Sequence, residues 1–318
     1  YFWYSMSKME NKSENIARLI KLKASELGFM DCGISAVGFL DEEEGRLVNW
    51  LKAGMNGEMG YMANHLDKRL NPALLVENAR SVVSVLLNYF PSNNQADPEA
   101  PVLSKYAYGV DYHFVMKEKL AELLKFIQDE IAPCGGRCFV DSAPVLDRAW
   151  AARAGLGWIG KNTNLISPEH GSFFFIGELI IDLELSSDEK LVRNHCGNCS
   201  RCIDACPTKA IVEPYVLDAR KCISYQTIEN RSAIDSELKG KFENRVFGCD
   251  ICQDVCPWNL KSEPHDEAAF QPDERFLLMK KEDWYNLNKE TFNELFRKSA
   301  VKRAKFEGLK RNLDFLNE

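Results

Sequence analysis

The stretch "CGNCSRCIDACP" at residues 196–207 places four cysteines in eleven positions and ends with a proline. Its spacing, Cys-x2-Cys-x2-Cys-x3-Cys-Pro, is that of bacterial ferredoxins, in which cysteine thiolates hold cubane iron–sulfur clusters. A second stretch, "CDICQDVCP" at residues 249–257, repeats most of this pattern, and Cys222 lies between the two. The eight cysteines together match the ligand requirement of two 4Fe-4S clusters.

In ferredoxins with two clusters, the last cysteine of each run binds the other cluster. This rule predicts two ligand sets: Cys196, Cys199, Cys202 and Cys256 for one cluster, and Cys206, Cys222, Cys249 and Cys252 for the other. Two structural zinc sites are the alternative, but such sites usually pair two separated Cys-x2-Cys knuckles. The sequence therefore favours an electron-transfer module, which needs a partner domain to carry out chemistry on a substrate.

The composition is that of an ordinary globular protein. The chain has 318 residues, of which 45% are apolar and 27% charged, and this length allows two domains. No apolar run has the roughly 20 residues that span a bilayer, and the first residues show neither a secretory signal nor a twin arginine. We therefore expect a cytoplasmic protein without membrane association, whose eleven cysteines are not a disulfide framework.

Helical and strand patterns mix along the chain without regular βαβ alternation. Helical spacing of apolar residues occurs at 13–27, 41–54, 111–131 and 144–156, and strand-like runs occur at 29–35, 81–90, 137–141 and 172–185. This order predicts an α+β fold. We expect three parts: a catalytic domain at 9–190, a double-cluster domain at 191–262, and a helical C-terminal segment at 263–318.

Asp141 is the candidate acid of the first domain, because it ends the strand-like run "RCFVD". A buried carboxyl group with a raised pKa can donate a proton to a leaving oxygen. The alternative role is an N-cap for the helix expected near Pro144. His113, in "DYHFVM", falls short of the D-x-H-x-x-G motif of corrinoid-binding histidines, because Met116 stands in place of the glycine.

The charge distribution is uneven. The net charge is −7, yet "RKSAVKRAKFEGLKR" at 297–311 has seven basic residues and one acidic residue, a local net charge of +6. Such a segment can contact nucleic-acid phosphates. The alternative is a solvated amphipathic helix that turns Val301, Ala304, Phe306 and Leu309 partly inward. From the residues alone, the chain is a two-cluster reductase of unknown substrate.

The motifs in their order resemble those of the epoxyqueuosine reductase family from about residue 13 to 312. They include "DKRLNP", "YAYGVDYH", "VDSAPVLDRAWAARAGLGWIGKN", "PEHGSFFFIGEL", "CISY" and "GCDICQDVCPWN". The resemblance implies a nitroreductase-like cobalamin-binding domain followed by a ferredoxin-like double 4Fe-4S module. It also implies the last step of queuosine biosynthesis, the reduction of epoxyqueuosine to queuosine at the wobble position of tRNA.

The resemblance also implies roles for single residues. Asp141 would donate the proton, and the cobalamin contacts would be Arg69, Ser104, Asp141, Leu165, Ile176, Ser224, Arg231, Cys249 and Asp250. The partners would be a tRNA with a GUN anticodon carrying epoxyqueuosine and a low-potential electron donor, with the enzyme acting as a monomer. Many relatives continue into C-terminal helical repeats that help hold tRNA, so here residues 297–311 become the expected tRNA contact.

Two other functions remain open at this stage. A reductive dehalogenase would share cobalamin and two clusters, but such proteins typically carry a twin-arginine signal and differ in the second cluster spacing. An electron-transfer protein serving a partner enzyme would leave Asp141 without a task.

Overall fold

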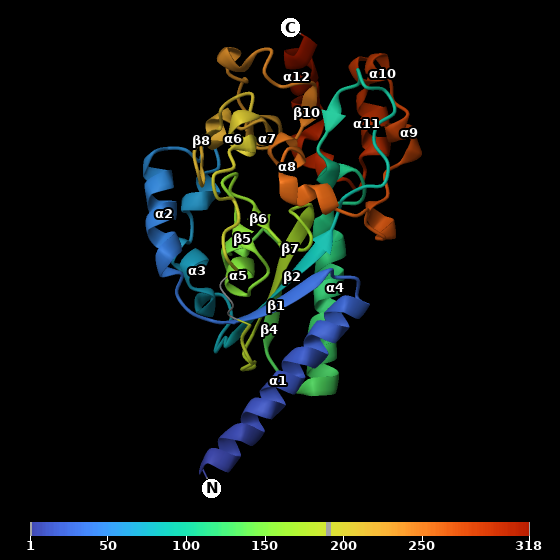
Figure 1. The fold of residues 1–318 in the computed structure, drawn as a ribbon. Helices are drawn as coiled ribbons and strands as arrows, with labels where there is room; N and C mark the ends of the chain where they lie inside the picture. The colour runs from blue at the N-terminus through green and yellow to red at the C-terminus, as the bar shows by residue number, and fades with distance from the viewer. Residues whose placement is uncertain (1, 189–191, 318) are drawn as a thin grey trace.

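Four antiparallel strands form the central sheet of this computed structural model, which describes residues 2–188 and 192–317 (Figure 1). The strand order is β1-β2-β7-β4, with β1 at Asp31–Ala36, β2 at Ser81–Asn88, β4 at Gly136–Phe139 and β7 at Phe174–Ile181. The middle strands are apolar on both faces, as expected of strands covered on both sides. The sheet therefore needs helices on both faces.

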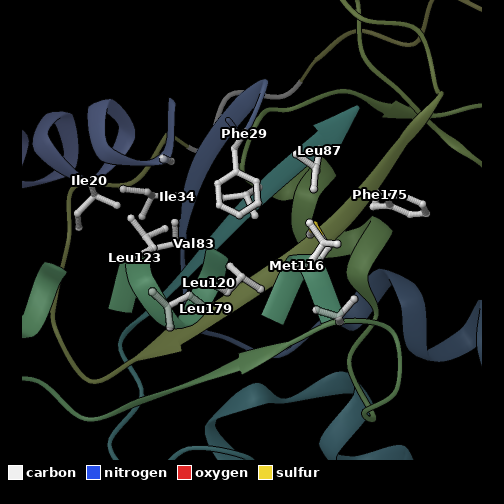
Figure 2. Close-up of a cluster of buried hydrophobic side chains, with 14 of the residues drawn as sticks. Ile20, Phe29, Ile34, Val83, Leu87, Met116, Leu120, Leu123, Phe175 and Leu179 are labelled. Atoms are coloured by element: carbon white, nitrogen blue, oxygen red, sulfur yellow. The ribbon is translucent and has the colours of Figure 1, made fainter. Parts of the chain in front are cut away.

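Two long helices cover one face of the sheet, α1 (Phe2–Glu26) and α4 (Tyr112–Phe126). Figure 2 shows Met116 and Leu120 of α4 packed beside Leu179 of β7 in this core. Gly177 of β7 allows the close approach, since a Cβ there would lie 2.5 Å from the Met116 side chain. The helix consequently lies directly on the strand.

The other face is covered by the short helix α5 (Asp147–Arg153), whose Trp150 is fully buried. Beyond it lie α2 (Asp41–Lys52) and α3 (Leu66–Leu70), and the small hairpin of β5 (Trp158–Ile159) and β6 (Leu165–Ile166). Residues alternate along β7, so that Ile176, Glu178 and Ile180 face this side. Glu178 is a completely buried acidic residue on this face.

A second core joins distant parts of the chain. Strand β3 (Val102–Leu103) pairs in parallel with β10 (Arg245–Phe247), and both pack against the C-terminal helices. These helices are α9 (Glu274–Leu277), α10 (Lys281–Tyr285), α11 (Lys289–Leu295) and α12 (Lys305–Asn317). The three parts expected from the sequence thus share packing, and their boundaries stay a prediction.

The double-cluster module is built from short elements in two similar halves. Helix α6 (Arg201–Asp204) lies in the first cysteine run and α8 (Ile251–Asp254) in the second, and the two helices contact each other. Between them lie β8 (Ile211–Glu213), β9 (Val216–Leu217) and α7 (Ile223–Ile228). In Figure 1 this module and the C-terminal helices lie together at the end of the sheet away from the N-terminus.

The predicted α+β fold is confirmed, with differences at element ends. The helix expected over 144–156 begins at Asp147, because Pro144 restricts the residue before it and Leu146 is not helical. The helix expected over 111–131 is α-helical only to Phe126 and ends in a π turn. None of the helices in the described ranges is both long and apolar enough to cross a membrane.

Candidate functional site

Asp141 lies two residues beyond β4 and makes two side-chain hydrogen bonds to residues of α4. Nε2 of His113 lies 2.6 Å from Asp141 Oδ1, and the hydroxyl of Tyr112 donates to Oδ2. The carboxyl group remains 47% exposed. Its backbone has φ of +31°, a conformation that non-glycine residues rarely adopt and that often marks functional sites. The side chain is thus fixed in place and still reachable by a substrate.

The N-cap alternative for Asp141 is wrong. Helix α5 starts six residues later, its N-cap position is Leu146, and no side chain caps it. Asp141 instead bonds across to the first turn of α4, where Asp111 is the N-cap. The structure therefore assigns Asp141 no role in ending or starting a helix.

Both ring nitrogens of His113 face carboxylates. Nδ1 lies 2.7 Å from Asp111 Oδ1, and Nε2 faces Asp141. Each nitrogen can donate to its carboxylate only if the imidazole is doubly protonated. Burial lowers the pKa of His113, but the hydrogen bonds and charges of Asp111 and Asp141 outweigh it and raise the pKa to about 9. His113 is therefore a cation at neutral pH.

The pKa of Asp141 is not raised, so Asp141 does not hold a proton of its own at rest. Burial acts to raise this pKa, but the hydrogen bond and charge of His113 and the hydrogen bond of Tyr112 dominate and lower the pKa of Asp141 below its ordinary value. Asp141 is ionised in the resting protein, and the proton sits on His113. The pair holds one transferable proton between two side chains, which is a different arrangement from a single protonated acid.

An aromatic stack packs against the His113–Asp141 pair. The ring of Tyr112 lies 4.1 Å from that of Phe175, nearly parallel to it, and 4.3 Å from the ring of His113. Burial, followed by the charge of Asp141, raises the pKa of Tyr112, so its hydroxyl keeps its proton and donates to Asp141. The stack fixes the orientation of both donors.

Four cysteine side chains line a small cavity beside Trp258 and His195. They are Cys196, Cys199, Cys202 and Cys256, which is the first ligand set predicted from the spacing. Lys161 stabilises the loop that carries the first of these cysteines, since its Nζ donates to the carbonyls of Gly197 and Cys199 at 2.7 and 2.9 Å. The swapped cysteine from the second run thus lies with the first run.

The remaining four cysteines are electrostatic neighbours of one another. Burial raises the pKa of the Cys222 thiol, and the charge of Cys206 adds to this effect. Burial raises the pKa of Cys249 to about 12 and raises that of Cys252 well above its ordinary value, and the charge of Cys222 adds to both shifts. Every cysteine is unpaired, so all eight thiols are available as ligands. The arrangement suits two clusters with four thiolates each.

Ser104, Cys249 and Asp250, three of the expected cobalamin contacts, lie together where β3 meets the cluster module. The hydroxyl of Ser104 donates to Asp250 Oδ1, and the N–H of Lys105 donates to Oδ2 at 2.8 Å. Cys249, which precedes Asp250 in the chain, is also a member of the second thiol set. One side chain of the first domain is thereby joined to the cluster module.

Leu165 and Ile176 belong to one apolar cluster on the α5 face of the sheet. Ile176 is the one residue of the described strand β7 that is only half-buried, and it pairs with Leu86 of β2 at a point beyond the residues of β7 that pair with β4. A large group with an apolar face, such as a corrin ring, fits this position.

The other three expected cobalamin contacts, Arg69, Ser224 and Arg231, have different surroundings from one another. Arg69 is buried and donates to the carbonyls of Asn64 and Tyr61. Ser224 hydrogen-bonds to Cys222. The N–H of Arg231 donates to Glu58 at 2.8 Å, and its own side chain is exposed. These three surround the site without forming a single cluster.

Residues 297–311 are not one continuous helix. A 3-10 helix at Ala300–Ala304 precedes α12. Lys305, where α12 begins, has φ of +60° and breaks the continuity of the two helices. Val301, Ala304 and Leu309 are buried. Arg303 pairs with Glu229, at 2.5 Å between Nε and Oε1, and Arg311 donates to three backbone carbonyls. Among the described residues, Arg297, Lys298 and Lys305 make no side-chain hydrogen bond or ion pair.

The sequence interpretation missed the role of His113 and gave none to Tyr112. It tested His113 only against a corrinoid motif, because Asp141 lies 28 residues away in the chain. The signal that was present is Asp111, an N-cap that also fixes the histidine ring. An Asp-x-His run at a helix start is consistent with a charged imidazole held at the helix end.

Comparison with known proteins adds two family matches. Residues 195–259 match the model of a 4Fe-4S double cluster binding domain, which confirms the predicted two-cluster module. Residues 69–142 match the model named Epoxyqueuosine reductase QueG, DUF1730. An epoxyqueuosine reductase of Cellulophaga algicola is 58% identical over 96% of this chain and 99% of its own length. One of Pseudomonas aeruginosa is 46% identical over 94% of this chain and 84% of its own length.

Solved structures give the same name. An epoxyqueuosine reductase crystallised with an epoxyqueuosine-modified tRNA-Tyr stem loop matches with a TM-score of 0.87 and 29% identity, over 94% of this chain and 80% of that one. The enzyme of Streptococcus thermophilus matches with a TM-score of 0.86 and 31% identity, over 95% of this chain and 80% of that one. A catabolic reductive dehalogenase shares the fold alone, with 15% identity, a TM-score of 0.50 and coverage of 96% and 36%.

Proposed function

The chain belongs to the epoxyqueuosine reductase family, and we propose from this premise that it reduces epoxyqueuosine to queuosine in tRNA. The observation that carries the proposal is 58% identity to an epoxyqueuosine reductase over nearly the full length of both chains. The reaction removes the epoxide oxygen as water and leaves an alkene, so it consumes two electrons and two protons. The protein is accordingly an oxidoreductase.

The chain's own residues suit both kinds of electron-carrying group. The thiols around the cavity, Cys196, Cys199, Cys202 and Cys256, would hold one 4Fe-4S cluster, and Cys206, Cys222, Cys249 and Cys252 the other. Cys202 and Cys252 are within electrostatic reach of each other, which supports a short path between the two sets. Electrons would enter from a low-potential donor.

The half-buried side chain of Ile176 and the polar junction of Ser104 and Asp250 support a cobalamin site between the two domains. Cobalamin, when bound, supplies a low-valent cobalt that reduces the epoxide carbon. Arg69, Ser104, Leu165, Ile176, Ser224, Arg231, Cys249 and Asp250 are the residues that we assign to its binding, with Asp141 on the side of the substrate.

His113 and Asp141 would handle the proton. Asp141 is the exposed member of the pair and the one that touches substrate, while His113 carries the proton at rest. As the epoxide C–O bond breaks, negative charge develops on oxygen, and the proton passes from His113 through Asp141 to that oxygen. Tyr112 holds Asp141 in the orientation needed for this transfer.

The substrate would be a tRNA with a GUN anticodon that carries epoxyqueuosine. A relative 29% identical to this chain was crystallised with such a modified stem loop. The exposed cations Arg297, Lys298 and Lys305 are available for phosphate contacts, and the backbone carbonyl of Lys298 accepts from Asp111 beside the proton-carrying pair. We further expect the enzyme to act as a monomer in the cytoplasm.

The two alternative functions are not favoured. The dehalogenase likeness is one of fold alone, at 15% identity over 36% of the other chain. A protein that only passes electrons would have no use for the charged His113–Asp141 pair on an exposed surface.

The proposal can be tested in cells whose tRNA accumulates epoxyqueuosine because they lack their own reductase. Expression of this chain should convert the nucleoside to queuosine, as read by mass spectrometry of digested tRNA. The Asp141→Asn variant, expressed to the same level, should leave epoxyqueuosine in place. Epoxyqueuosine persisting with the wild-type chain folded and loaded with clusters would reject the proposal.

A further inference from the structure

A second pair of acidic side chains lies between the sheet and α5, and the chemistry described so far leaves it unused. Glu178 of β7 is completely buried, and neither of its carboxyl oxygens receives a hydrogen bond from an N–H or O–H group within the described residues. The carboxyl group of Asp147, the first residue of α5, lies against it. Oδ1 of Asp147 is also buried without such a donor.

Two carboxyl groups in contact and away from water cannot both be ionised. The repulsion between two such charges in a dry site is large, and a hydrogen bond between them requires that one of them carries a proton. Burial, followed by the charge of Asp147, raises the pKa of Glu178 well above its ordinary value. Burial also raises the pKa of Asp147. The pair therefore holds one proton at neutral pH.

Asp141 is the acidic side chain whose charge acts on both members of the pair. The charged groups that face the pair are Asp141, which raises the pKa of both members, and Arg148 and Arg69, which lower that of Asp147. From the neighbouring strand β2, Ser84 stands directly opposite Glu178 and its hydroxyl is likewise buried without a partner. Asp147 is the less buried member of the pair, although its Oδ1 is itself buried.

We propose that Asp147 and Glu178 share a proton that reloads Asp141 during the reaction, an inference that rests on the proposed function. Deoxygenation needs two protons per epoxide, and the His113–Asp141 pair carries one. The first proton is used when one C–O bond breaks and the oxygen takes it up. The second is used when the other C–O bond breaks and the oxygen leaves as water, while the donor supplies two electrons.

The order of events follows from the charges. While His113 is a cation it keeps Asp141 ionised, so the shared proton has no reason to move. Once His113 has given up its proton, the cation beside Asp141 is gone and the affinity of Asp141 for a proton rises. The proton held by Asp147 and Glu178 can then pass to Asp141. Because they act through Asp141 and touch no substrate, Asp147 and Glu178 are positioning residues for the proton.

The first test needs no substrate. Infrared difference spectra of the loaded wild-type protein against Glu178→Gln, at neutral pH, should show the C=O band of a protonated carboxyl group in the wild type only. In the variant the amide N–H can donate to Asp147, which then ionises. Absence of the band in the wild type would overturn the shared proton.

The second test is turnover with epoxyqueuosine tRNA. Glu178→Gln and Asp147→Asn should each lower the turnover rate by about 10-fold or more. Their rates should also fall as pH rises, because the second proton must then come from solvent. High concentrations of a small protonated buffer such as imidazolium should restore the rate of both variants, which a purely structural defect would not allow. Glu184→Gln, an exposed carboxyl on the same chain segment, is the matched control.

The outcomes distinguish failure of the proton delivery from failure of the proposed function. A band that is present, together with wild-type rate and pH dependence in both variants, would overturn the delivery of the proton and leave the proposed function standing. Failure of the wild-type chain to convert the tRNA would overturn the proposed function and the delivery step with it, while the band still decides whether the pair shares a proton.

Discussion

His113 Nε2 lies 2.6 Å from Asp141 Oδ1, although the two residues are 28 positions apart in the chain. The contact joins the first turn of α4 to the loop after β4, so it exists only once the sheet and its covering helix are assembled. It makes His113 a cation and Asp141 an anion at neutral pH. At rest, the proton of this pair is consequently carried by the histidine.

Replacement of Asp141 by asparagine should abolish turnover while leaving the cofactors in place. The amide can neither accept the proton of His113 nor pass it to oxygen, and loss of a general acid typically costs about 10²–10⁴-fold in rate. Single-turnover conversion of epoxyqueuosine tRNA measures the effect. Asp129→Asn, an exposed change on the π turn after α4, should behave as the wild type. Wild-type rates in Asp141→Asn would remove this residue from the mechanism.

The rate should depend on pH through His113. Its pKa is raised to about 9, so the imidazolium is present below that pH and is lost above it. We therefore expect wild-type turnover to fall as pH rises through about 9, and His113→Gln to be slow and free of this alkaline limb. An unchanged limb in His113→Gln would assign the ionisation to another group.

The same shift predicts a change in stability. Because the folded-state pKa of His113 lies above its ordinary value of 6.5, its ion pairs stabilise the fold fully below about pH 6.5, and this contribution disappears as pH rises through about 9. The difference in unfolding free energy between wild type and His113→Gln should thus shrink with rising pH. Denaturant unfolding at several pH values measures it, and a difference that grows with pH would contradict the assignment.

The ligand swap between the two cysteine runs can be tested with single substitutions. If Cys256 belongs with the first run, Cys256→Ala and Cys199→Ala should lose the same cluster, and Cys222→Ala the other. Each variant should keep about half of the iron, with the paramagnetic spectrum of the reduced protein showing which cluster remains. Loss of the same signal in Cys256→Ala and Cys222→Ala would reverse the assignment.

Charge reversal of Arg297, Lys298 and Lys305 together should weaken tRNA binding. These cations make no side-chain hydrogen bond or ion pair in the described part of the chain, so they can release counterions when they meet phosphates. We expect about a 10-fold loss of affinity and a shallower salt dependence of binding. Lys125→Glu, on the far end of α4, is the control. Equal affinity in the triple variant would assign the phosphate contacts to another surface.

Arg311, in the same basic segment, should behave differently. Its guanidinium donates to the carbonyls of Gln226, Asn230 and Ser232, each at 2.7 Å. Arg311→Met should leave these carbonyls without a donor and destabilise the fold by roughly 2 kcal/mol. Urea unfolding is the measurement, and stability unchanged from the wild type would return Arg311 to the group of tRNA-binding cations.

The sequence predicted well what depends on local spacing. The cysteine runs predicted the double-cluster module, and the run ending at Asp141 placed an acid just beyond β4. Continuous apolar runs placed β2 and β7 within a few residues of their ends. These features depend on near neighbours in the chain, which is why periodicity and spacing carry them.

The protonation states could not be predicted in the same way. They depend on contacts between distant residues, His113 with Asp141 and Asp147 with Glu178. The sequence places a carboxyl group at a strand end, but the cation that lowers its pKa comes from another element. Likewise, the basic segment 297–311 looks uniform in sequence, but Lys305 breaks it and Arg303 and Arg311 are engaged within the fold.

The most direct test of the central claim is nucleoside mass spectrometry on epoxyqueuosine tRNA. The tRNA would be incubated without oxygen with the purified protein, both clusters reconstituted, cobalamin and a low-potential reductant. We predict that the nucleoside loses one oxygen, and that the loss requires protein and cobalamin together. An unchanged nucleoside, with both clusters intact and reducible and cobalamin bound, would contradict the account.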